Sequence, residues 1–148
     1  MNDFVENVPF LALIDDDSHS AHLLTRMLLA HGSPDVTTYA SAEVGSAALN
    51  AVLSDPTANW PSLVIVDLKA HSSANLDFIT AHHTMWRPKG VPIVVMSVPL
   101  DRQARETLER AGASAVFFRH AELDAYRREV AGIVSYWART QRLDAVGM

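Results

Sequence analysis

The stretch LVIVDLK, residues 63–69, sets the fold class that this sequence predicts. An unbroken apolar run, rich in β-branched residues, leads to Asp67 and then to Lys69. Such a run is typical of a strand that is buried on both faces, as in a parallel sheet covered by helices. An aspartate at the end of that strand would lie at the edge of the sheet where open α/β sheets bind ligands.

Other short apolar runs alternate with longer segments of helical period, which is the pattern of βα units around a parallel sheet. Together with Leu63–Val66, the predicted strands are Phe10–Ile14, Val36–Tyr39, Ile93–Met96 and Ala115–Phe118. We therefore predict an α/β fold with a doubly wound, five-stranded parallel sheet of strand order 2-1-3-4-5. We expect a single domain over residues 1–148, with a core from about residue 8 to residue 140 and a tail at residues 143–148.

Helices are predicted where apolar residues recur three and four positions apart. Ser41 and Asp101 are suited to cap the second and fourth helices, and Gly32 and Gly112 to close the first and fourth. The second helix is expected to bury Val44, Ala47, Ala48, Ala51 and Val52. The last and longest helix follows Leu123, Tyr126, Val130, Ile133, Val134 and Trp137.

Composition narrows the class of protein. A chain of 148 residues with 49% apolar and 20% charged residues is ordinary for one soluble domain. The formal charge of −5 argues against broad binding to nucleic acid or anionic membranes. The absence of cysteine excludes disulfides and thiolate metal sites. The first residues are acidic where a signal peptide is basic, and the longest apolar run is too short to span a membrane, so we expect a cytoplasmic protein.

Four predicted strands end in polar residues. The first ends in Asp15-Asp16-Asp17, the third in Asp67, the fourth in Ser97 and the fifth in Arg119. In the order 2-1-3-4-5 these ends are neighbours. Grouped carboxylates repel one another and require a cation, and oxygen ligands without His or Cys suit a hard ion such as Mg²⁺. Metal, hydroxyl and guanidinium together bind a phosphoryl group, which leaves one carboxylate to accept it.

The segments LALIDDDSHSAHLL, LVIVDLK, PIVVMSV and GASAVFFRH resemble, in order and spacing, the motifs of the receiver domain of bacterial two-component response regulators. The resemblance covers about the first 140 residues. It implies that a histidine kinase transfers a phosphoryl group from its phosphohistidine to Asp67. The implied site consists of Asp15, Asp16 and Asp67 as Mg²⁺ ligands, Lys69 as a ligand through its backbone carbonyl, Ser97 as the switch hydroxyl and Arg119 in place of the family lysine.

The resemblance also implies the partners of the protein. These are a sensor histidine kinase or phosphotransfer protein, a downstream protein, and a second copy bound through the face of the fourth helix, fifth strand and last helix. No direct contact with nucleic acid or membrane is expected, and catalysis is limited to phosphoryl acceptance and slow self-dephosphorylation. The segment AYRREVAGIVSYWARTQ, residues 125–141, is similar to the last helix of stand-alone receivers that accompany bacterial phytochrome kinases.

Four departures from the receiver pattern bear on signalling. The proline and glycine of the loop after the acceptor are replaced by His71 and Asn75, of which Asn75 tolerates a left-handed backbone and can partly replace the glycine. The family's Lys-Pro pair is Arg119-His120, so its usual cis bond should be trans. The remaining departures are Val116 in place of the switch aromatic residue and Val98 in place of a small residue.

Two alternatives remain open. In a degenerate receiver, Arg119 and Lys69 would hold the pocket closed, and the protein would bind partners without phosphorylation. A haloacid-dehalogenase-type phosphatase would use Asp15 and Asp17 as its Asp-x-Asp motif, although His19 stands where that motif next requires Thr or Val.

Overall fold

The computed structural model describes residues 8–146 and has the predicted sheet. All strands are parallel and their order is β2-β1-β3-β4-β5. The strands are β1 (Phe10–Asp15), β2 (Asp35–Tyr39), β3 (Leu63–Asp67), β4 (Ile93–Ser97) and β5 (Ala115–Phe118). The predicted strands are therefore confirmed, and four of them are one residue longer than expected.

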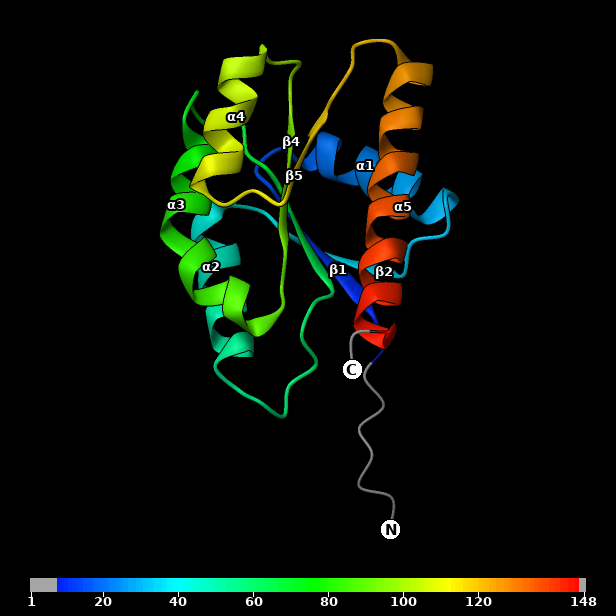
Figure 1. Ribbon diagram of the computed structural model, residues 1–148. Helices are drawn as coiled ribbons and strands as arrows, with labels where there is room; N and C mark the ends of the chain where they lie inside the picture. The colour runs from blue at the N-terminus through cyan, green and yellow to red at the C-terminus, as the bar shows by residue number, and fades with distance from the viewer. Residues whose placement is uncertain (1–7, 147–148) are drawn as a thin grey trace.

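Helices cover both faces of the sheet (Figure 1). The helices α1 and α5 lie on one face, and α2, α3 and α4 lie on the other. The helices are α1 (Ser18–Ala30), α2 (Ala42–Leu53), α3 (Ala74–Trp86), α4 (Arg102–Ala111) and α5 (Leu123–Val146), with a 3-10 turn, η1 (Arg87–Lys89), after α3. Between residues 8 and 146, no helix is both long and apolar enough to cross a membrane.

Alternation along the central strands divides the core into two clusters. Leu11 and Leu13 of β1 pack with α1 and α5, whereas Ala12 and Ile14 pack with the three helices on the opposite face. Because both faces are covered, every residue of β3 is buried. This burial explains the uninterrupted apolar run that predicted the fold.

The expected buried face of α2 is wrong. Val44 is 53% exposed, and Gly45, Leu49 and Leu53 are buried instead. Gly45 lies so close to β1 that a Cβ atom there would be 2.9 Å from the side chain of Ile14. The helix therefore turns its two leucines and its one glycine to the sheet, because leucine buries more apolar area than the alanine and valine stripe would.

The predicted helix caps are confirmed. Ser41 and Asp101 accept hydrogen bonds from the backbone N–H groups three residues ahead, at 3.1 and 2.8 Å. Gly32 and Gly112 have positive φ angles of 90° and 126° just after α1 and α4. The apolar stripe of α5 departs from expectation at Leu123, which is 47% exposed. The same helix continues through residues 143–146, which we expected in the tail, and residues 147–148 lie outside the described part.

Candidate functional site

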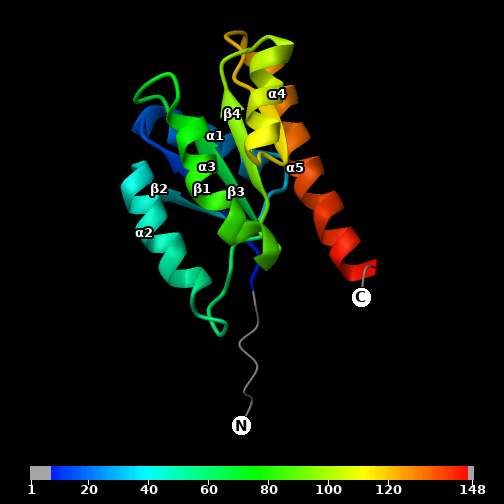
Figure 2. The same ribbon diagram turned by 60° about the vertical axis from the view of Figure 1, so that its left-hand side comes forward.

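The carboxyl ends of β1, β3, β4 and β5, which are consecutive in the sheet, lie side by side, as predicted. Asp15 and Asp67 are partners in the register of β1 and β3. The backbone N–H of Arg119 donates to the carbonyl of Ser97 at 2.6 Å, which joins the ends of β5 and β4. In Figure 2 the loop that follows β3 and the loop that follows β4 both lie at the upper end of the molecule, and residues of both line one cavity. The fold thus gathers polar residues that are far apart in sequence.

Asp67 and Asp15 are buried carboxylates that share two cationic side chains. Asp67 is fully buried and Asp15 is 2% exposed. The Arg119 guanidinium lies 2.5 Å from Oδ1 of Asp67. The ammonium Nζ of Lys69 lies 2.7 Å from Oδ1 of Asp15 and 3.1 Å from Oδ1 of Asp67. Two positive charges therefore compensate the two carboxylates that the fold removes from water.

Burial and charge act in opposite directions on Asp67. Burial raises the pKa of this carboxyl group above its ordinary value, the positive charge of Lys69 lowers it, the negative charge of Asp15 raises it, and Arg119 lowers it. Burial is the largest of these effects, and the net pKa of Asp67 is raised. Tyr126, which is buried on α5, also has a raised pKa, because of its burial and then because of the negative charge of Asp67.

Ser20 belongs to this site although it was not predicted as a site residue. Its hydroxyl donates to Oδ2 of Asp15 at 2.8 Å and lies 3.3 Å from Oδ2 of Asp67. A serine in the first turn of a helix is common for local reasons, so its residue type carries no signal. Its position five residues after Asp15, one helical turn above the strand end, was the available clue.

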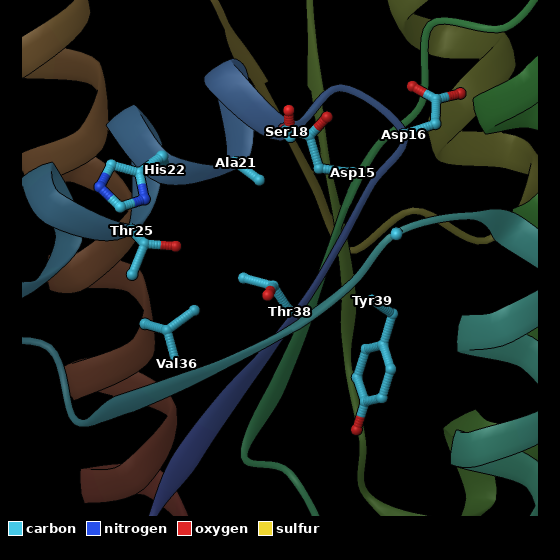
Figure 3. Close-up of a pocket in the computed structure, with 10 residues that line it drawn as sticks. Asp15, Asp16, Ser18, Ala21, His22, Thr25, Val36, Thr38 and Tyr39 are labelled. Atoms are coloured by element: carbon cyan, nitrogen blue, oxygen red, sulfur yellow. The ribbon is translucent and has the colours of Figure 1, made fainter.

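Asp16 and Asp17 do not join the carboxylate pair. Asp16 accepts from the backbone N–H groups of Lys69 and Ala70, both at 2.9 Å, and so fixes the loop after β3. Asp17 caps α1 by accepting from the N–H groups of His19 and Ser20. Figure 3 shows the side chains of Asp15 and Asp16 on opposite sides of their loop, beside a cavity of about 490 Å³ between α1 and β2. The three consecutive aspartates therefore have three different tasks.

The expected Mg²⁺ ligands do not fit that ion as they are arranged. In the part of the chain that the structure describes, no three His, Asp or Glu side chains converge to hold a metal. The Lys69 ammonium contacts the same oxygens of Asp15 and Asp67 that would bind an ion. Asp16 faces backbone N–H groups instead.

A cavity of about 290 Å³ opens beside this pair. Two cationic groups and a hydroxyl, from Lys69, Arg119 and Ser97, contribute to its wall, and Val98 lies at its exposed edge. Such a lining suits an anion with several oxygens. Asp67 lies behind the two cationic side chains that it binds, so a ligand reaches its carboxylate only when they move.

Comparison with known proteins identifies the fold through solved structures. No protein-family model and no curated protein matches the chain. Among solved structures, the phosphorylated cyanobacterial phytochrome response regulator RcpA matches with a TM-score of 0.72 and 20% identity, over 88% of this chain and 94% of that one. The Mn²⁺-bound form of response regulator Rcp1 matches with a TM-score of 0.70 and 16% identity, over 86% of this chain and 93% of that one. The chemotaxis protein CheY4 of Vibrio cholerae matches with a TM-score of 0.66 and 14% identity, over 87% of this chain and 98% of that one.

The chain has the CheY-like receiver fold. Two of the departures from the receiver pattern lie in β5 or directly after it. Val116 packs into the core on the side of α2, α3 and α4, and its neighbour Phe117 packs on the opposite side, because successive side chains of a strand point to opposite faces. Residues 8–146 contain no cis peptide bond, so the bond between Arg119 and His120 is trans, as expected. His120 instead lies 3.4 Å from Glu129 of α5.

The loop after β3 is stabilised differently from our expectation. Asn75 is the second residue of α3, and no residue other than glycine has a positive φ between residues 8 and 146, so Asn75 does not replace the glycine through a left-handed backbone. Its side chain accepts from the N–H of Leu68 at 2.9 Å and donates to the carbonyl of Met96 at 3.3 Å. In this receiver fold, a side-chain amide links the ends of β3 and β4. His71 is exposed and contacts Ser73.

Proposed function

We propose that the protein is a signalling receiver in which Asp67 accepts a phosphoryl group from a histidine kinase or a phosphotransfer protein. The observation that carries this proposal is the position of Arg119, with its guanidinium on the buried Asp67 carboxylate and in the wall of the cavity shared with Ser97. A guanidinium beside an acceptor carboxylate can bind two phosphoryl oxygens and stabilise the charge of the transferred group.

The transfer requires Asp67 to be uncovered. Arg119 would move from the carboxylate to the oxygens of the incoming group, and Ser97 would donate its hydroxyl to another of them. A carboxylate oxygen of Asp67 then forms a bond to phosphorus while the bond between phosphorus and the donor's imidazole nitrogen breaks. The imidazole takes up a proton as it leaves. The product is an acyl phosphate.

The signal would be read from the surface formed by α4, β5 and α5. This surface would bind a downstream protein or a second copy of the chain, in the cytoplasm where the kinase acts. Its polar groups include His120, which directly follows Arg119 in the chain, and Glu129 of α5. Glu129 lies 3.4 Å from the His120 ring and accepts from the N–H of Phe118 at 2.9 Å. A shift of Arg119 would therefore be felt at this surface.

A second candidate function is favoured by the closed state of the site. Lys69 and Arg119 both contact Asp67, and together they satisfy the buried charges without a phosphoryl group. The protein would then be a receiver that binds its partners independently of phosphorylation.

Incubation with acetyl phosphate or phosphoramidate, followed by intact-protein mass spectrometry, separates the two functions. The first predicts a gain of one phosphoryl group that Asp67→Asn abolishes and the exposed-site control Asp35→Asn retains. Beryllofluoride should likewise shift the amide NMR signals around Asp67. If neither reagent changes the mass or the spectrum in the presence or absence of Mg²⁺, the phosphoryl function is wrong and the second candidate stands.

A further inference from the structure

We propose that the Lys69 ammonium is a tethered cation that takes the place of a divalent ion between Asp15 and Asp67. The site is then held together without metal, and Mg²⁺ or Mn²⁺ binds only by displacing Lys69. The inference rests on the proposed function, because it assigns the counterion and hence the control of the same site. It does not require that phosphoryl transfer be observed.

Three protein oxygens surround the Lys69 ammonium. An ammonium has three N–H donors. Nζ of Lys69 meets Oδ1 of Asp15 at 2.7 Å, Oδ1 of Asp67 at 3.1 Å and the backbone carbonyl of Asp67 at 3.0 Å. Two of these contacts are hydrogen bonds and the third is an ion-pair contact, so three protein oxygens surround the cation at the place between the two carboxylates.

The opposite oxygens of the two carboxylates are joined as well. The Ser20 hydroxyl spans Oδ2 of Asp15 and Oδ2 of Asp67, at 2.8 and 3.3 Å. The carboxylates are thus bridged on both sides, by an ammonium and by a hydroxyl. This double bridge fixes their separation and leaves neither acid oxygen of Asp15 without a hydrogen-bond donor.

Charge explains why a metal would have to compete. Asp15 and Asp67 carry two negative charges, and Lys69 and Arg119 carry two positive ones, so the net charge of these four groups is already zero. A divalent ion on the same Oδ1 atoms would add two positive charges within contact distance of the ammonium, which is strongly unfavourable at a buried site.

The Lys69 side chain can move away from the two carboxylates. Its side chain is 24% exposed, whereas those of Asp15 and Asp67 are almost completely buried. Its backbone N–H is held by Asp16 at 2.9 Å, so the loop can stay in place while the side chain swings to solvent. The ammonium can therefore leave the site while the backbone of Lys69 stays in place, whereas the two carboxylates that it joins remain buried.

Metal titration of two lysine variants tests the inference without a phosphoryl donor. Mn²⁺ or Mg²⁺ binding to wild type, Lys69→Met and Lys89→Met is measured by isothermal titration calorimetry and by Mn²⁺-induced broadening of amide NMR signals. Lys69→Met should bind the ions roughly tenfold or more tightly than wild type, because it exposes a carboxylate pair without its counterion. Lys89→Met, which changes an exposed lysine near Trp60, should bind like wild type.

A thermal measurement keeps the test decisive if Lys69→Met folds poorly. The melting temperature of Lys69→Gln, which keeps hydrogen-bond donors, should rise with millimolar Mg²⁺, while that of wild type should stay almost constant. Equal metal affinity in wild type and Lys69→Met, or an equal Mg²⁺-induced rise in melting temperature, would overturn the inference. Failure of Asp67 to accept phosphate would instead overturn the proposed function and leave these metal results interpretable.

Discussion

The pairing of Arg119 with Asp67 can be measured as a coupling energy. Arg119→Met leaves the buried Asp67 with one cation fewer, and we expect it to lower the free energy of unfolding by about 1–3 kcal/mol, since Lys69 still compensates part of the charge. In the double variant Arg119→Met/Asp67→Asn the unpaired charge is gone, so most of this loss should be recovered. Urea denaturation of the two single variants and the double variant gives the coupling. Simple additivity of the two losses would show that the pair is energetically independent.

His82 should make stability depend on pH. It stacks on Trp86 and bonds Ser46 at 2.7 Å, and burial lowers its pKa. A lowered folded pKa means that the unfolded chain binds the proton first. Stability is therefore full above the unfolded pKa of about 6.5 and is lost as the pH falls through the lowered folded value. Urea titrations from pH 8 to about pH 5 should show a smaller loss for His82→Gln than for wild type, whereas the exposed-site variant His19→Gln should keep the wild-type slope. Parallel curves for wild type and His82→Gln would contradict this role.

At the residue scale, prediction from sequence succeeded where the backbone decides the position. Asp15, Asp67, Ser97 and Arg119 follow parallel strands, and the sheet brings such positions to one edge whatever their side chains do. Prediction from sequence failed where the orientation of a side chain decides which groups are in contact. The pattern left open whether the Lys69 ammonium would turn to the carboxylates, as in the alternative in which Lys69 and Arg119 close the pocket, or would point to solvent.

The packing of α2 against β1 depends on Gly45. Alanine usually stabilises a helix interior relative to glycine by about 1 kcal/mol. At Gly45 the added Cβ would lie 2.9 Å from the side chain of Ile14, so we expect Gly45→Ala to destabilise the protein by about 1–3 kcal/mol. Gly132→Ala in α5 is the matched control, because its nearest contact would be an ordinary 3.6 Å to Phe117. Urea denaturation should give opposite signs for the two substitutions, and the same sign for both would refute the steric argument.

Helical period alone could not choose the buried face of α2. Its alanines and valines form one stripe, and Gly45, Leu49 and Leu53 form another at the same spacing. A glycine reads as a weak helix residue in sequence, yet here it permits the close approach that brings both leucines to the sheet. The buried face of α2 is decided by its contact with Ile14 of β1, a residue that is far away in the chain.

At the scale of the whole molecule, the site and the proposed binding surface of α4, β5 and α5 are different parts of the protein. The carboxylate pair lies at one edge, and β5 carries Arg119 at its end and Val116 in the core on the side of α2, α3 and α4. Position 116 is a valine, so no aromatic side chain links the site to the surface there, whereas the backbone N–H of Phe118 and the ring of His120 both contact Glu129 of α5. In the proposed function, a signal would therefore pass along the backbone of β5 to these contacts with Glu129.

The proposed homodimer would use the surface of α4, β5 and α5, where charged side chains of α4 form ion pairs within one chain. On α4, Glu106 binds Arg102 at 3.0 Å and Arg110 at 3.4 Å, each four residues away. A dimer through α4, β5 and α5 would exchange such exposed pairs for pairs between chains, so it should form with beryllofluoride at low salt and dissociate near 1 M salt, where charges are screened within about 3 Å. Sedimentation velocity should show that Glu106→Lys prevents dimerisation, whereas Asp35→Lys, on β2 at the other edge of the sheet, leaves it unchanged. A monomer under every condition, or a dimer that Asp35→Lys disrupts and Glu106→Lys does not, would place the contact elsewhere.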